Sequence, residues 1–125
     1  MADAVRLRLP AGTAYGRVAR VTTAAIARRH GFSYREVEDL RLAIDEAIIA
    51  LIDAADPTGA VDLHYLVDEG EVTITVDGAA DRPPEAVSRF HTLVTPLVDR
   101  ADLDLDAGQV RLVKRGSRYA SPPQA

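Results

Sequence analysis

The sequence predicts an α+β domain, a two-layer sandwich in which three helices cover one face of a mainly antiparallel sheet. Three segments carry apolar residues at helical spacing, and five shorter segments alternate apolar with polar residues as half-buried strands do. The last four strands come as two hairpins, each joined by a short turn that contains glycine. Hairpins make neighbouring strands antiparallel, so the expected order is β-α-α-β-β-α-β-β.

The first strand and the first helix are expected close to the N-terminus. Apolar residues alternate with arginines over residues 4–9, which predicts a short half-buried strand. A helix is predicted over residues 13–29, and His30-Gly31 is expected to end it. One stripe of this helix is expected to face the core and the other side to face water. The predicted core stripe is Val18, Val21, Ala25 and Ile26, and the predicted polar side holds Arg17, Arg20 and Arg28.

The second helix is the clearest element in the sequence. Ser33 followed by Glu36 is the sequence of a capping box. Apolar residues then keep helical spacing for about six turns, until Asp56-Pro57 ends the helix. The predicted buried stripe is Val37, Leu40, Ile44, Ala47, Ile48, Leu51, Ile52 and Ala55.

Two hairpins enclose the third predicted helix. Alternating residues over 61–67 and 72–76 predict the first hairpin, and those over 103–105 and 110–113 predict the second. A helix is expected between them, over residues 84–98, with proline in its first turn. The stripe Val87, Phe90, Val94 and Leu97 is predicted to face the core.

Composition narrows the class of protein. At 125 residues the chain has the length of one domain, expected over residues 1–115 with a disordered tail over 116–125. Without cysteine it has no disulfide framework and no thiolate metal site, and we expect no metal. It has neither the roughly 18 apolar residues of a membrane span nor a signal-peptide core, so a cytoplasmic protein is expected. A net charge of −4 without a basic stripe argues against a nucleic-acid binder.

The second predicted helix also carries the most specific motif. Residues 34–47 read YREVEDLRLAIDEA, and this motif, the order of elements and the closing strand VRLVKR resemble the anti-sigma-factor kinases of the RsbW/SpoIIAB type. Those proteins are small members of the GHKL ATPase superfamily, with the histidine-kinase-like fold. The resemblance runs from Val5 to Arg115 and implies that fold for this domain.

The resemblance implies a catalytic pair on this helix, of which one member is present. In the family a Glu acts as general base and an Asn four residues later holds Mg²⁺, because residues at that spacing lie one above the other. Glu46 matches the base, but Ala50 stands in the place of the Asn and has no oxygen to offer a metal. Glu46 is a catalytic candidate only if the protein is an active kinase, and otherwise a charge on the helix surface.

At the positions of two nucleotide-binding motifs of the family, this chain departs from the family pattern. The motif Asp-x-Gly-x-Gly, whose Asp bonds the adenine amino group, corresponds to residues 77–81, DGAAD, which keep the Asp without the two glycines. The glycine-rich stretch that cradles phosphate corresponds to residues 88–97, SRFHTLVTPL, which contain no glycine. Asp77 is a nucleotide-binding candidate only if nucleotide binds, and otherwise an ordinary residue at the end of a strand, followed by a turn glycine. We expect the ATP site to be lost and no cofactor to bind.

Two functions stay open on this basis. The first is an anti-sigma factor that sequesters an RNA polymerase sigma factor and is released by an antagonist protein of the STAS type. The second is an active protein serine kinase that uses ATP and Mg²⁺ to phosphorylate that antagonist. The resemblance also implies a homodimer, with Val5, Leu7 and Val18 near its axis. For the partner surface we expect Arg17 and Arg20, although the simpler interpretation is that these arginines solvate the helix.

Overall fold

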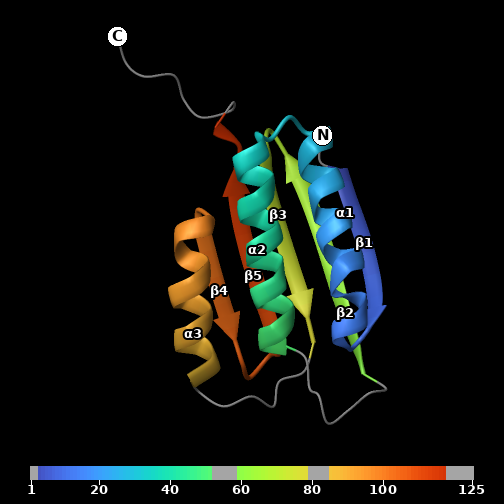
Figure 1. Ribbon diagram of the computed structural model, residues 1–125, viewed down its shortest axis with the longest axis vertical. Helices are drawn as coiled ribbons and strands as arrows, with labels where there is room; N and C mark the ends of the chain where they lie inside the picture. Colours follow the sequence, from blue (N-terminus) through green and yellow to red (C-terminus); the bar gives the residue numbers. More distant parts are fainter. Residues whose placement is uncertain (1–2, 52–58, 79–84, 118–125) are drawn as a thin grey trace.

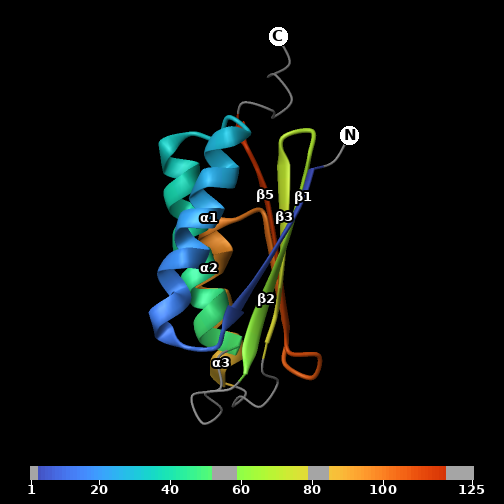
Figure 2. The same ribbon diagram turned by 90° about the vertical axis from the view of Figure 1, so that its right-hand side faces the viewer.

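The computed structural model describes residues 3–51, 59–78 and 85–117, which form one sheet with a layer of helices on one face (Figures 1 and 2). The strands are β1 (Asp3–Pro10), β2 (Ala60–Asp68), β3 (Glu71–Asp77), β4 (Arg100–Asp104) and β5 (Gln109–Arg115). The helices are α1 (Gly16–Arg29), α2 (Tyr34–Leu51) and α3 (Glu85–Val94), with 3-10 turns η1 (Thr13–Tyr15) and η2 (Thr95–Leu97). The predicted α+β class and the order of elements are confirmed.

The sheet is antiparallel throughout, in the order β1-β2-β3-β5-β4, so β1 and β4 are its edges. Side chains alternate between the two faces along each strand. One row in register, facing the helices, is Leu7, Leu63, Val76, Val110 and Leu103. The adjacent row, Arg8, Asp62, Asp77, Gln109 and Asp104, points the other way. We call the side of the sheet without helices the open face (Figure 2).

The predicted capping box at the start of α2 is confirmed. The Glu36 N–H donates to the Ser33 hydroxyl at 3.2 Å, and the Ser33 N–H donates to Glu36 Oε1 at 2.8 Å. The Ser117 N–H donates to the other carboxylate oxygen of Glu36, which joins the end of β5 to the start of α2. Burial raises the pKa of Glu36, but these hydrogen bonds outweigh burial and hold it below its usual value.

The predicted core stripe of α1 is wrong. Val18 and Val21 are 42% and 56% exposed, Ala25 is exposed, and only Ile26 of the predicted four packs partly against the core. The buried residues are Ala19, Thr23, Ala24 and Ala27. Because these side chains are small, α1 lies close to α2 and to the sheet. Alanine adds little apolar surface, so hydropathy spacing selected the valines, which face outward.

Two elements end earlier than their patterns predict. α3 ends at Val94, and the chain continues as η2 around Pro96, because proline lacks the N–H that a helical hydrogen bond needs. β4 ends at Asp104, so Leu105, predicted as a strand residue, lies in the turn, where its carbonyl accepts from the Gly108 N–H.

Other predicted features lie partly outside the described residues. This holds for Ile52 and Ala55 at the end of the α2 stripe and for residues 118–125 of the predicted tail. The first two residues of that tail are bound to the domain: the Gly116 N–H donates to the Gly70 carbonyl at 3.0 Å, and Ser117 bonds Glu36 as described above.

Candidate functional site

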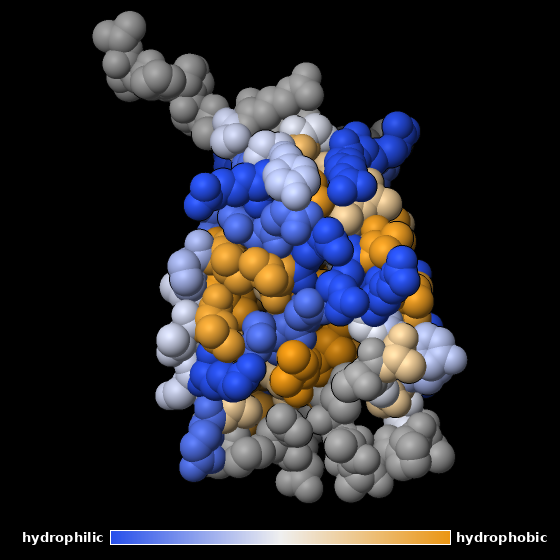
Figure 3. Space-filling view, viewed as in Figure 1, coloured by the Kyte–Doolittle hydropathy of each residue, from blue (hydrophilic) through white to orange (hydrophobic). Residues whose placement is uncertain are grey.

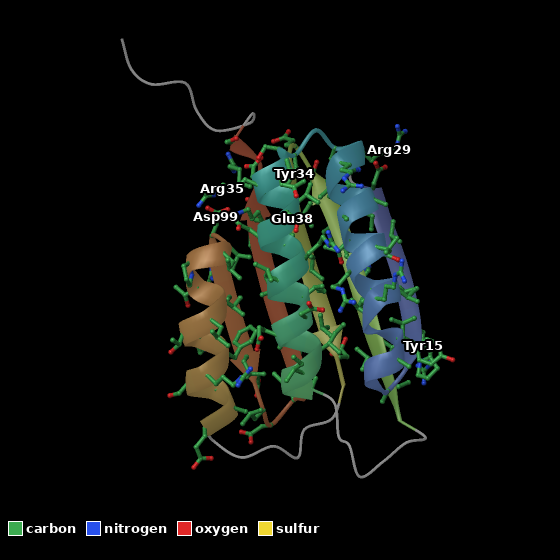
Figure 4. All side chains as sticks on the ribbon, in the orientation of Figure 1. Tyr15, Arg29, Tyr34, Arg35, Glu38 and Asp99 are labelled. Atoms are coloured by element: carbon green, nitrogen blue, oxygen red, sulfur yellow. The ribbon has the colours of Figure 1, made fainter. Side chains whose placement is uncertain are left out.

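A pocket opens between the last two turns of α2 and the first turns of α3. It has a volume of about 410 Å³ and is lined by Glu46, Ile49 and Ala50 from α2 and by Glu85, Ala86, Arg89 and Phe90 from α3. We call it the α2–α3 pocket. Glu46 and Ala50 are one helical turn apart and face it together. The pocket therefore holds the two positions at which the resembled family carries its general base and its metal ligand. Figure 4 places Tyr34, Arg35 and Glu38 at the other end of α2.

The lining of the pocket is acidic on balance. Glu46 and Glu85 contribute carboxylates, and Arg89 is the one basic side chain among the lining residues described. Arg89 Nη2 lies 3.5 Å from Glu46 Oε2, and the exposed fractions of the two side chains are 63% and 21%. A single contact at this length is at the outer limit of a hydrogen bond. Arg89 thus reaches in from the rim, and Glu46 is the sheltered charge.

Glu85 occupies the first position of α3, where the negative charge is favoured by the helix dipole. No residue in the described ranges forms an ion pair with it. Sequence reasoning named neither Glu85 nor Arg89. Their spacing of four residues within a predicted helix was a usable signal, because it sets both on one side of that helix.

The segment expected to cradle phosphate is helical. Ser88 to Val94 belong to α3, and the remaining three residues form η2. Inside a helix each N–H donates to the carbonyl oxygen four residues earlier, so these groups are not free to bind phosphate. Only the first turn of α3 has N–H groups without a helical partner, and the carboxylate of Glu85 belongs to that turn.

The structure does not bring Asp77 to this pocket. Val72, Ile74 and Val76 are buried beneath the helices, so the Asp77 side chain points to the open face. There Gln109 Nε2 donates to Asp77 Oδ1 at 2.9 Å. The alternation of β3 was the signal for this placement, since it assigns residue 78 to the helical side.

Gly78, at that inward position, has no room for a side chain. A Cβ built on Gly78 would lie 2.9 Å from both the Cβ and the carbonyl oxygen of Leu51, at the end of α2. Real Cβ atoms do not approach other atoms this closely. A carboxylate facing the helices from this end of β3 would have to displace α2.

Arg17 and Arg20, the predicted partner-binding residues, lie on different sides of α1. Arg17 is exposed. Arg20 turns toward α2, and its Nη1 donates to Asp45 Oδ1 at 2.9 Å; the two side chains are 34% and 31% exposed. The structure therefore places Arg17 on the outer surface and Arg20 in the junction between two helices.

Comparison with known proteins agrees with this architecture. Residues 9–112 match the family model described as a histidine kinase-like ATPase domain. The chain belongs to this family. Three curated relatives of the histidine kinase-like ATPase domain are named serine-protein kinase RsbW. The relative from Listeria monocytogenes serotype 4a (strain HCC23) is 35% identical to this chain over 79 residues, which are 61% of this chain and 50% of the relative.

The other two relatives give similar figures. The protein of Oceanobacillus iheyensis (strain DSM 14371) is 34% identical over 83 residues, 64% of this chain and 51% of the relative. That of Bacillus cereus (strain B4264) is 32% identical over 80 residues, 64% of this chain and 44% of the relative. The chain spans about half the length of the curated relatives it matches. The predicted resemblance is confirmed at the level of the family.

Over the residues that the structure describes, no three His, Asp or Glu side chains gather as metal ligands would. None of the helices in that part of the chain is long and apolar enough to cross a membrane.

Proposed function

We propose that the protein is an anti-sigma factor-like regulator that sequesters an RNA polymerase sigma factor by protein–protein binding, without using ATP. The observation that carries the proposal is the α2–α3 pocket. It combines the positions of the family's catalytic and phosphate-binding motifs, but its side chains do not suit a magnesium–nucleotide complex. An antagonist protein of the STAS type is the partner that would release the sigma factor.

Three features of the structure argue against a magnesium–nucleotide complex. Ala50 offers no oxygen ligand to Mg²⁺ at the position one turn after Glu46. The contact between Gly78 and Leu51 leaves no space for an adenine-binding carboxylate on the inner face of β3. Two carboxylates against one guanidinium repel a triphosphate at the place where the phosphates would lie.

Calorimetric titration with Mg-ATP tests this proposal. We expect no affinity tighter than about 1 mM, or about −4 kcal/mol. Ala50→Asn, which restores the missing ligand type, should leave the affinity unchanged, because Gly78, Glu85 and the helical phosphate segment still disfavour nucleotide. Micromolar binding by the unaltered protein would refute the proposal.

An active protein serine kinase is the second candidate, and Glu46 favours it. Its carboxylate lies in the pocket, where a general base is needed, and the matched relatives are named serine-protein kinases. This candidate requires Mg-ATP binding and phosphate transfer to a serine of the antagonist, and Glu46→Gln, which removes the base, should abolish the transfer. Phosphate transfer from labelled ATP to a purified STAS-type antagonist separates the two functions.

The outer surface of α1 supports the homodimer that we also propose. β1 is a sheet edge, and Val5 on this strand is 38% exposed. Val18 and Val21 on α1 add exposed apolar surface, and Arg17 lies among them. We expect light scattering to report a dimer at tens of micromolar protein, and Val21→Asp to give a monomer. A monomeric unaltered protein would contradict this assembly.

A further inference from the structure

We propose that the α2–α3 pocket receives a basic side chain presented by an amphipathic helix of a partner protein. The inference rests on the proposed function, because it requires a pocket that nucleotide does not fill. It specifies the chemistry of the partner: one arginine or lysine, flanked on the same helical face by aliphatic residues.

The charge of the pocket is the first reason to expect a basic ligand. Glu46 is 21% exposed, and its described partner Arg89 is 63% exposed and touches it at 3.5 Å. Glu85 adds a second carboxylate that has no ion pair in the described part of the chain. One loosely held guanidinium therefore faces two carboxylates. A second cation entering between them would complement the charge, and an anion would meet repulsion.

The apolar rim of the pocket is the reason to expect aliphatic residues beside the basic one. Ile49 lines the pocket and is 45% exposed, while Leu42 on α2 and Leu93 on α3 are 54% and 41% exposed. Leu42 lies one heptad before Ile49, and Leu93 lies one turn after Arg89, so apolar groups continue the pocket along both helices. Figure 3 shows apolar patches on this face of the helical layer, separated by charged side chains. Exposed apolar surface rimmed by charge is typical of a protein-binding site.

The shape of the site favours a helix as the occupant. Two helices side by side leave a groove, and an amphipathic helix binds such a groove through residues at heptad and half-heptad spacing. Leu42 and Ile49 are one heptad apart, a separation of roughly 10 Å along the axis. Aliphatic residues one heptad apart on a partner helix would match them, and a basic residue midway would reach Glu46 and Glu85.

A designed peptide tests this inference directly. The probe is a fluorescein-labelled peptide of about 15 residues, long enough to form a helix on binding, made of alanine and glutamine with two leucines one heptad apart and an arginine midway. Two matched peptides replace the arginine by glutamate or both leucines by alanine. By fluorescence anisotropy, we expect the arginine–leucine peptide to bind at least about tenfold more tightly than either.

Variants of the protein locate the binding. Glu46→Gln with Glu85→Gln should weaken the arginine–leucine peptide about tenfold. The control is Asp68→Asn at the exposed end of β2 with Glu69→Gln in the turn that follows it. It makes the same change of net charge and should leave the affinity within about twofold. Circular dichroism melts verify that each variant is folded. Equal binding of the arginine and glutamate peptides, or unchanged binding in the pocket variant, would overturn the inference.

Arg89→Ala distinguishes a cation site from an anion site. Removing the competing guanidinium should strengthen binding of the arginine–leucine peptide about threefold to tenfold, because Glu46 is released for the ligand. Weaker binding would overturn the inference. A Mg-ATP titration on the same preparation separates the two proposals. If neither nucleotide nor peptide binds, the cation site is wrong and the nucleotide-free regulator stands; if nucleotide binds at micromolar concentration, the proposed function itself is wrong.

Discussion

α2 packs against a helix on each side, and its two junctions are built differently. In the α1–α2 junction, Arg20 donates to Asp45 at 2.9 Å, and both side chains are about one-third exposed (34% and 31%). In the α2–α3 junction, Arg89 reaches Glu46 at 3.5 Å and is 63% exposed. Small buried residues close the first junction, whereas the second opens into a pocket of about 410 Å³.

The difference indicates which junction is available for binding. Below the first junction, Thr23 Oγ1 and Tyr65 Oη are 2.7 Å apart, and Thr23 also donates to the Ala19 carbonyl. The polar groups there hydrogen-bond with one another and with the backbone, as buried polar groups usually do. In the second junction the sheltered Glu46 has a loose partner, so a ligand can compete for it without breaking the fold.

The largest effect is expected at the floor of the second junction. Phe90 is 1% exposed, and Phe90→Ala should lower the free energy of unfolding by about 3–5 kcal/mol because it leaves a cavity. Urea denaturation measures this, with Leu93→Ala, a 41% exposed residue on the same helix, as the control. We expect the control to cost less than about 1 kcal/mol. A small effect of Phe90→Ala would mean that the whole junction is loose, not only its rim.

A smaller loss is expected in the first junction from Thr23→Val. The substitution leaves the buried Tyr65 hydroxyl without its partner, which costs about 1–3 kcal/mol. Thr23→Val combined with Tyr65→Phe should recover part of that loss, because both polar groups are then gone. If the single variant is as stable as the original protein, the hydrogen bond does not hold this junction together.

The pH dependence of Tyr65 provides a second test of the same contact. Burial raises the pKa of Tyr65 from 10.0 to about 12, against a smaller lowering by the hydrogen bond with Thr23. A raised folded-state pKa means that the stabilisation is complete below pH 10 and is lost as the pH rises toward 12. Urea midpoints of the original protein and Tyr65→Phe should therefore converge in this alkaline range.

The fold was predictable from the sequence to a greater extent than the candidate site. Alternating strands, the Ser33–Glu36 box and turn glycines are local signals, and the structure confirms them. The orientation of α1 was not predictable in this way, because its buried face is made of three alanines and a threonine. For Asp77 the alternation of β3 was sufficient, because it directs this side chain away from the helices. The pairing of Arg89 with Glu46 joins residues 43 positions apart, and no local pattern reports such contacts.

Arg20→Ala should have a modest effect on stability. Its ion pair with Asp45 is partly exposed, so we expect a loss of about 0.5–1 kcal/mol, reduced further at high salt. Arg20→Lys should recover part of the loss. If Arg20 also contacts a partner, binding should fall by about 2 kcal/mol or more; comparing the urea and binding data for Arg17→Ala and Arg20→Ala separates the two roles.

The smallest effect on stability is expected for Arg89→Ala. The Arg89 side chain is 63% exposed and touches Glu46 at one long contact, so solvent screens the pair. The expected change is below about 0.5 kcal/mol. A double-mutant cycle with Glu46→Ala should give a coupling energy close to zero, and the matching cycle of Arg20 with Asp45→Ala a larger one. The order of these two couplings decides the comparison. If Arg89–Glu46 proved the stronger pair, the second junction would be closed by its own ion pair, and Glu46 would not be available to a basic side chain of a partner.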